Sequence, residues 1–224
     1  MVAASALIAA YNEAPHIADV IAGTQRWVSQ VVVVDDGSTD GTAARAREAG
    51  ATVLRHASNL GKGRAIRTGL AYLLDQPCSH VLFIDGDLQH DPDEIPALLA
   101  KAADGAGEFV IGEREFVKET MPHARYYTNI VGSWILSRFI GADVMDSQSG
   151  FRLIRSDYLR RISLTATGYE IETEMLIKLV QAGATLDRVS IRRLDYAGAH
   201  SKIRPFRDTS RTCLLAVKYR YLSG

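Results

Sequence analysis

The stretch Val81-Leu82-Phe83-Ile84-Asp85-Gly86-Asp87 joins a run of apolar residues to two carboxylates separated by one glycine. A run that is apolar at every position is typical of a parallel β-strand covered on both faces. Earlier in the chain, the stretch Val31-Val32-Val33-Val34-Asp35-Asp36 likewise joins an apolar run to two carboxylates, here adjacent to each other. Both stretches therefore predict buried strands whose carboxyl ends carry acidic side chains.

Helical patterns alternate with short strands through the first half of the chain. We expect strands at 6–10, 31–34, 52–55 and 81–85, with helices at 14–26, 41–49, 63–74 and 92–103. This alternation predicts right-handed βαβ units and a doubly wound, mostly parallel sheet flanked by helices. Ligands bind such sheets beyond the carboxyl ends of the strands, so the residues that follow each strand are candidates for the site.

The second half has a less regular pattern. It predicts strands at 109–111, 150–154 and 186–191, and helices at 124–140, 170–181 and 207–221. The sequence contains no evident linker, repeat or low-complexity segment. We therefore expect one α/β domain.

Composition limits the possible classes of function. A chain of 224 residues, 47% of them hydrophobic, fits one globular domain. Its 26 basic residues balance 26 acidic ones, so no overall charge favours binding to nucleic acid. Two cysteines fit a reducing compartment. The sequence shows neither a signal-peptide pattern nor the ~18 apolar residues of a membrane span, so we expect a soluble or peripheral protein.

The Asp85-Gly86-Asp87 turn predicts a metal site. Two carboxylates at the mouth of a parallel sheet can converge on one hard divalent cation, and Gly86 lets the backbone approach a ligand. Gln89 and His90 supply further lone pairs. Mg²⁺ or Mn²⁺ held there would neutralise a departing diphosphate. The alternative interpretation is a solvated acidic turn, which fits poorly after a fully apolar strand.

Asp36 is a second candidate for ligand binding. In dinucleotide sites a carboxylate at a strand end accepts a hydrogen bond from the ligand, and we assign Asp36 a similar role toward a ribose hydroxyl or a base N–H. The alternative, a helix cap, suits Asp40 better.

The glycine-rich segment 59–64 does not match a phosphate-binding loop. Gly63 occupies the position of the Ser/Thr, and His56 occupies that of the first glycine. A helix start beside Lys62 remains able to bind an anion.

The polar segments of the chain form an ordered set. Its members are Tyr11-Asn12-Glu13, Asp35-Asp36-Gly37-Ser38-Thr39-Asp40-Gly41-Thr42, Asn59-Leu60-Gly61-Lys62-Gly63, Asp85-Gly86-Asp87-Leu88-Gln89-His90-Asp91-Pro92, Ser149-Gly150-Phe151-Arg152 and Ser201-Lys202. This set resembles glycosyltransferase family 2, in its dolichol-phosphate mannosyltransferase-like (polyprenyl-phosphate glycosyltransferase) branch, over nearly the whole chain. The resemblance implies one nucleotide-sugar-binding domain of the glycosyltransferase A type over 1–224, with a Rossmann-like sheet. Residues 1–112 would form its nucleotide-sugar-binding half and 113–224 its acceptor-binding half.

The resemblance also implies the donor site. Tyr11, Glu13 and Asp36 would hold the nucleoside. The metal ligands would be Asp85, Asp87 and Gln89. The implied nucleotide-sugar-binding residues are Ala10, Tyr11, Glu13, Asp36, Lys62, Asp85, Gly86, Asp87, Lys202 and Arg204. The family has an arginine before the Ser-Lys loop that this chain lacks, and Arg204 or Arg207 would replace it.

The implied acceptor-phosphate residues are Arg114, Arg125 and Asn129, because a guanidinium fork suits phosphate oxygens. The two arginines have solvated surface charges as their alternative interpretation. Asp87, Arg114 and Arg125 are also implied catalytic residues. Glu174 is the fourth, since it matches a family acid near the catalytic centre; its alternative is the solvent face of a helix.

The function implied is inverting, metal-dependent transfer of a hexose from a nucleotide sugar, such as GDP-mannose or UDP-glucose, to a polyprenyl (dolichyl or undecaprenyl) phosphate. A phosphomonoester, with a second pKa near ~6, is already nucleophilic at neutral pH, whereas a sugar hydroxyl needs a carboxylate base. The alternatives are transfer to a saccharide hydroxyl and a non-catalytic module that binds a nucleotide sugar.

The same resemblance implies a peripheral, cytoplasmic enzyme at the inner face of the cell membrane. An aromatic segment at 126–139 would rest on the bilayer interface. The expected partners are the nucleotide sugar, the polyprenyl phosphate and the membrane surface, with a separate membrane partner protein as a further option and no nucleic acid.

Overall fold

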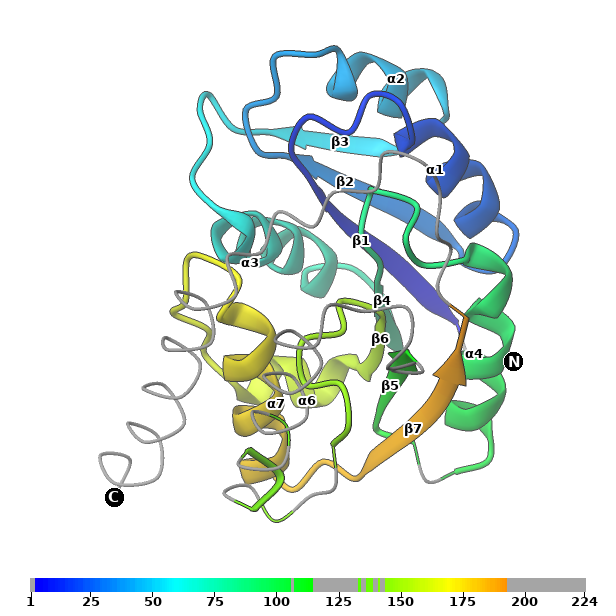
Figure 1. Cartoon of the computed structure of the whole chain (residues 1–224), viewed down its shortest axis with the longest axis vertical. Coiled ribbons are helices and arrows are strands. Elements are labelled where there is room, and N and C mark those ends of the chain that lie inside the picture. The colour runs from blue at the N-terminus through cyan, green and yellow to red at the C-terminus, as the bar shows by residue number, and fades with distance from the viewer. Residues whose placement is uncertain are drawn as a thin grey trace, which may run out of the picture.

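The computed structural model describes residues 3–105, 107–114, 133, 136–138, 141 and 144–192. These residues form a seven-stranded sheet with the strand order β3-β2-β1-β4-β6-β5-β7. Helices cover both faces of the sheet (Figure 1). The predicted fold class, a single α/β domain with a mostly parallel sheet, is confirmed.

The first half contains the predicted alternation of strands and helices. Its strands are β1 (Ala4–Ala10), β2 (Gln30–Asp35), β3 (Thr52–Arg55) and β4 (His80–Phe83). Its helices are α1 (Ile17–Gln25), α2 (Thr42–Glu48), α3 (Lys62–Leu74) and α4 (Ile95–Ala103), the last preceded by the 3₁₀ turn η1 (Pro92–Glu94). Strand β1 pairs in parallel with β2 and β4, and β2 pairs in parallel with β3.

The second half completes the sheet with one strand reversed. Its elements are β5 (Phe109–Arg114), β6 (Arg152–Arg155), α6 (Ser156–Arg161), α7 (Ile171–Gln181) and β7 (Leu186–Ile191). Strand β6 is antiparallel to both β4 and β5, while β5 and β7 are parallel. The sequence did not predict α6. Most of the helix predicted at 124–140, and all of that predicted at 207–221, lie outside the described residues.

The alternation of side chains along β2 explains why its valines form an unbroken apolar run. Val32 and Val34 pack on one face of the sheet with α3, α6 and α7, and Val31 and Val33 pack on the other with α1, α2 and α4. Each fully buried side chain of this kind favours folding by about 1.5–3 kcal/mol, before the entropy of ordering it. The sheet is therefore the middle layer between two apolar cores.

Strand direction brings the candidate residues to one edge of this layer. Because β1, β2 and β4 are mutually parallel, the segments that follow them emerge side by side. Strand β6 runs the opposite way, with Arg152 level with Phe83, so the residues just before β6 arrive at the same edge. None of the helices in the described ranges is both long and apolar enough to cross a membrane.

Candidate active site

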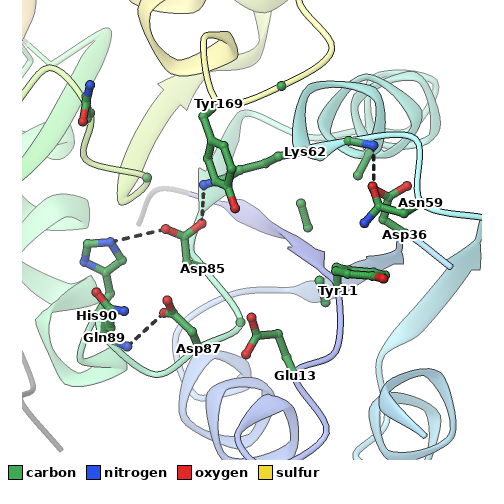
Figure 2. Close-up of a pocket in the computed structure, with 18 residues that line it drawn as sticks. Tyr11, Glu13, Asp36, Asn59, Lys62, Asp85, Asp87, Gln89, His90 and Tyr169 are labelled. Carbon is green, nitrogen blue, oxygen red and sulfur yellow. Dashed lines mark hydrogen bonds and ion pairs between the residues drawn. The ribbon is translucent and has the colours of Figure 1, made fainter. Parts of the chain in front are cut away.

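A pocket with a cavity volume of about 300 Å³ lies at this edge of the sheet (Figure 2). The predicted site residues that line it are Ala10, Tyr11, Glu13, Asp36, Lys62, Asp85, Gly86, Asp87 and Gln89. His90, which the sequence suggested as a further donor beside the metal ligands, also lines the pocket, and lining residues that the prediction did not assign include Asn59, Gln148, Gly150 and Tyr169. The pocket therefore unites the predicted donor-site residues of the first half with segments that precede β6 and α7.

Lys62, the first residue of α3, forms two ion pairs at the pocket wall. Its Nζ lies 2.6 Å from Asp85 Oδ1 and 2.7 Å from Glu172 Oε1. Burial alone would lower the pKa of Lys62, but the charges of the two carboxylates outweigh burial and raise that pKa above its usual value. Burial would likewise raise the pKa of Asp85, yet the Lys62 charge holds it well below its usual range. Lys62 and Asp85 thus form a fixed, charged pair.

Asp87 has a different electrostatic environment. Burial, and next the negative charge of Asp85, raise the pKa of Asp87. The backbone N–H of Gln89 donates to Asp87 Oδ1 at 3.1 Å, and Leu88 between them takes a left-handed conformation with φ 59°. A divalent cation between Asp85 and Asp87 would relieve the repulsion between the two carboxylates.

The donor set fits Mg²⁺ or Mn²⁺, although only in part as a preformed site. Asp85, Asp87 and Gln89 offer hard oxygen atoms, which these cations prefer. The described residues contain no group of three or more His, Cys, Asp or Glu side chains arranged to hold a metal. The remaining ligands would therefore come from water and from the phosphates of a bound nucleotide.

Two glycines beside the acidic turn allow close packing. A Cβ on Gly150 would lie 2.5 Å from Asp85 Oδ2, so this glycine lets the segment before β6 contact the carboxylate. A Cβ on Gly86 would lie 3.2 Å from Ile17 Cδ1, among core side chains. The structure therefore gives Gly86 a packing role against α1, in addition to its place in the pocket lining.

The adjacent carboxylates of Asp35 and Asp36 are separated by their partners. Asp35 accepts from the backbone N–H of Ser38 at 3.1 Å and lies 3.0 Å from Nε of Arg55. Asp36 faces the pocket and accepts from the backbone N–H groups of Leu60 at 2.9 Å and Gly61 at 2.8 Å. Asp35 therefore supports the turn, and Asp36 belongs to the site.

At the start of α3, several of the backbone N–H groups that could bind an anion already have partners within the protein. The N–H groups of Leu60 and Gly61 donate to Asp36, and that of Gly63 donates to the Thr167 carbonyl at 3.0 Å. A Cβ on Gly63 would lie 2.5 Å from the Ala166 carbonyl oxygen. Glycine is therefore required here by the packing of segment 166–167 against α3.

Arg152 is a buried cation that joins two walls of the pocket. Its guanidinium donates to the carbonyls of Ser147 at 2.8 Å, Ser149 at 2.7 Å and Glu172 at 2.6 Å. Burial lowers the pKa of Arg152 to about 10, so the side chain stays charged near neutral pH. Arg152 thereby fixes the segment around Gln148 against the first turn of α7.

Glu174 has contacts unlike those of a pocket residue. It is fully buried and accepts from the backbone N–H groups of Thr165 at 2.9 Å and Ala166 at 2.7 Å, with Lys178 Nζ 2.7 Å away. Glu172, two residues earlier, is the acid of α7 that contacts the pocket cation Lys62. Sequence reasoning missed Glu172, although its occurrence in the first turn of the helix is visible in the sequence.

The remaining predicted site residues cannot be placed by side chain. Arg114 is the last residue of β5, and only its backbone is described. Arg125, Asn129, Lys202 and Arg204 lie outside the described residues.

Comparison with known proteins identifies the class. A family model described as Glycosyl transferase family 2 matches residues 5–163. The chain is 36% identical over 178 residues to glycosyltransferase AglJ of Haloferax volcanii, covering 77% of this chain and 57% of that protein. It is 30% identical to the UDP-N-acetylglucosamine–dolichyl-phosphate N-acetylglucosaminyltransferase of Methanococcus voltae, covering 76% of this chain and 77% of that protein.

A solved structure agrees with this classification. Glucosyl-3-phosphoglycerate synthase from Mycobacterium tuberculosis, in complex with Mn²⁺ and UDP-glucose, is similar with a TM-score of 0.76 at 25% identity, covering 97% of this chain and 78% of that one. The fold is therefore that of an A-type glycosyltransferase, and the protein is an enzyme that transfers a sugar. It belongs to glycosyltransferase family 2. The chain spans little more than half the length of AglJ.

Proposed function

We propose that this enzyme transfers a hexose from a nucleotide sugar to a polyprenyl phosphate, with inversion at the anomeric carbon and with Mg²⁺ or Mn²⁺ as cofactor. The observation that carries the proposal is the division of the pocket. Tyr11, Asp36 and Asn59 lie toward one end, and Asp87 and Gln89 lie toward the other (Figure 2). The first end fits a nucleoside, and the second fits a diphosphate with its cation.

The nucleoside end offers a flat surface and an acceptor. The Tyr11 side chain is 38% exposed, which leaves part of its ring available for stacking against a base. Asp36 supplies carboxylate oxygens for a base or ribose donor. The ion pair of Lys62 with Asp85 joins the wall of the pocket to the first residue of the acidic turn (Figure 2).

The acidic turn would hold the metal through Asp87, Gln89 and Asp85. A divalent cation there supplies neutralisation of the charge that develops on the departing nucleoside diphosphate. Lys62 already compensates the charge of Asp85, whereas burial and the charge of Asp85 raise the pKa of Asp87, so a bound cation would mainly stabilise the Asp87 carboxylate.

A single in-line displacement fits this arrangement. An oxygen of the acceptor phosphate forms the bond to the anomeric carbon while the bond to the donor diphosphate breaks, and the diphosphate leaves with the electron pair. A phosphomonoester with a second pKa near ~6 needs no general base for this step. The proposal therefore assigns no proton transfer to Glu172 or Glu174.

The position of Arg114 supports a phosphate acceptor. Strands β4 and β5 are parallel to each other because both are antiparallel to β6, with Phe83 and Ile111 both level with Arg152. One strand separates them, so their axes lie roughly 10 Å apart. Arg114, the last residue of β5, therefore lies at the edge where Asp85 follows β4. Arg125 and Asn129, with Lys202 and Arg204 on the donor side, complete the proposed site.

The proposal also covers the roles of the two halves of the chain and the place where the enzyme works in the cell. Residues 1–112 serve mainly the donor and 113–224 mainly the acceptor. The enzyme works at the cytoplasmic face of the membrane, through segment 126–139, with or without a membrane partner protein. The relative from Methanococcus voltae, whose name specifies a dolichyl phosphate acceptor, supports this choice.

The test offers purified enzyme, Mn²⁺ and labelled nucleotide sugars to four acceptors in parallel: polyprenyl phosphate, polyprenol, a simple saccharide and 3-phosphoglycerate. We expect label only in polyprenyl phosphate. Label in the saccharide alone would contradict the proposal and indicate a carboxylate base. Donor binding without transfer to any acceptor, and without hydrolysis, would indicate a binding module.

A soluble phosphate acceptor is the second candidate. The structural similarity to glucosyl-3-phosphoglycerate synthase favours it, because both candidates present a phosphate to the arginines proposed here. Label in 3-phosphoglycerate, with none in the lipid, would establish this candidate instead.

A further inference from the structure

Asp36 has nearly exhausted its capacity to accept hydrogen bonds. Oδ1 accepts from the Leu60 N–H at 2.9 Å and contacts His56 Nδ1 at 2.7 Å, while Oδ2 accepts from the Gly61 N–H at 2.8 Å. A carboxylate has about four lone-pair sites, two on each oxygen. Three are occupied, so one site on Oδ2 remains for a ligand.

The geometry also fixes how His56 is protonated toward Asp36. A carboxylate only accepts, so the Nδ1–H of His56 must be the donor in the 2.7 Å contact. The other ring nitrogen, Nε2, lies 3.0 Å from Thr68 Oγ1, which holds the ring from its far side. The His56 side chain is 11% exposed, so its hydrogen bond to Asp36 is shielded from water.

We infer that the donor nucleotide is a uridine diphosphate sugar, selected by the single free acceptor site of Asp36, with His56 as the positioning residue that occupies the other oxygen. This inference rests on the proposed function, in which Tyr11 and Asp36 hold the nucleoside. It names which of the two donor types, uridine or guanosine, the pocket takes.

The bases differ in the number of donors on the edge that would meet Asp36. Uracil offers one N–H, at N3, between two carbonyls. Guanine offers two adjacent donors, N1–H and the N2 amino group, which require both carboxylate oxygens. With Oδ1 occupied by His56 and Leu60, one guanine donor would lose its water without gaining a partner. Such a loss weakens binding by roughly 10- to 100-fold.

The other common bases fit less well. Cytosine and adenine place a bare ring nitrogen beside their amino group, and its lone pair would face the carboxylate. Asn59 lines the pocket next to Asp36 (Figure 2), and its amide can donate to a base carbonyl. Uracil and guanine both carry such a carbonyl beside the ring N–H, so Asp36 and not Asn59 discriminates between them.

The experiment is calorimetric titration of the full chain in Mn²⁺ with UDP and with GDP. We expect UDP to bind roughly 10- to 100-fold more tightly. Equal or tighter binding of GDP would overturn the inference and leave the proposed function intact. Binding of neither nucleotide would refute the proposed function, and this inference with it.

Three variants test the role of His56. His56→Leu removes the donor and frees a site on Oδ1, so the preference for UDP should shrink toward parity. His56→Asn retains an N–H near the Nδ1 position and should restore the preference, which a purely structural role of His56 would not require. Thr68→Val removes only the contact with His56 Nε2, so the preference for UDP should remain. Circular dichroism and thermal melting establish that each variant is folded.

An unchanged preference for UDP in folded His56→Leu would overturn the assignment of His56. If His56→Leu does not fold, the test relies on His56→Asn and Thr68→Val. We expect both variants to retain the wild-type ratio of UDP to GDP affinity. Loss of that ratio in both variants would contradict the inference.

Discussion

Lys62 Nζ lies 2.7 Å from Glu172 Oε1 and thereby ties the first turn of α3 to the first turn of α7 across the wall of the pocket. The same ammonium group pairs with Asp85 at 2.6 Å. One cation therefore balances the buried carboxylate of Glu172 and the half-buried carboxylate of Asp85, which come from distant parts of the sequence. Among the described residues no other lysine or arginine forms an ion pair with either carboxylate, so removal of Lys62 would leave both without this partner.

Lys62→Met should destabilise the fold by about 3–5 kcal/mol, because uncompensated buried carboxylates are costly. Lys62→Met combined with Glu172→Gln should recover part of this loss, since one of the two charges is gone. Urea unfolding of the single and double variants measures the difference. Additive effects in the double variant would show that Lys62 and Glu172 are not coupled.

Asp87→Asn should abolish sugar transfer while the protein remains folded, because the carboxylate is a proposed metal ligand and not a core residue. Mn²⁺ should no longer raise the melting temperature in the presence of nucleotide. The matched control is Asp104→Asn, at an exposed position after α4, which should behave as wild type. Transfer at the wild-type rate by Asp87→Asn, or in excess chelator, would refute the metal assignment.

Arg152→Met should cost about 3–5 kcal/mol of stability, since three carbonyls lose a charged donor. Arg64→Met, on the exposed face of α3, removes an arginine without such partners and should change stability by no more than about 0.5 kcal/mol. Denaturant unfolding compares the two variants. Similar small effects in both would mean that Arg152 does not hold the pocket walls together.

Glu174→Gln distinguishes a structural acid from a catalytic one. The amide retains one acceptor oxygen for the Thr165 and Ala166 N–H groups, so we expect a loss of about 1–3 kcal/mol and continued transfer below the melting temperature. A folded variant without transfer activity would instead make Glu174 catalytic, as the family resemblance implied.

Glu113 should make the stability depend on pH. Burial raises the pKa of Glu113 above its ordinary value of 4.5, although the Met145 and Asp146 N–H groups act in the opposite direction. A raised pKa in the folded state means that the contribution of Glu113 is fully present below pH 4.5 and is lost as pH rises through the folded value. The difference in unfolding free energy between wild type and Glu113→Gln should therefore change across this window and stay constant above it.

The sequence predicts well what depends on neighbouring residues. The four consecutive valines of β2 are all buried because each face of the sheet packs against its own core, and the apolar run in the sequence is enough to predict this. The carboxylates after β2 and β4 meet in one pocket because parallel strands end at the same edge. These features required only periodicity and strand direction.

The features that the sequence did not predict depend on contacts between distant segments. Spacing alone could not show that Glu172, and not Glu174, reaches Lys62, because that depends on how α7 is rotated against α3. The contact of His56 with Asp36 Oδ1 was equally hidden. Nothing in the sequence distinguishes buried Arg152 from a surface arginine, since the difference lies in three carbonyls of other segments.

The place of β6 between β4 and β5 means that this part of the sheet is completed late in the sequence. Ribosomes release the N-terminal strands first, but β4 keeps an open edge until β6 inserts between it and β5. Gly150 can contact Asp85 only after β6 has inserted. Glu172 on α7, which pairs with Lys62, is synthesised later still. A nascent chain halted before residue 152 would therefore present a bare strand edge, prone to aggregation, and a half-built pocket. Completion of the pocket wall should accordingly be a late event of translation, after synthesis has passed the first turn of α7.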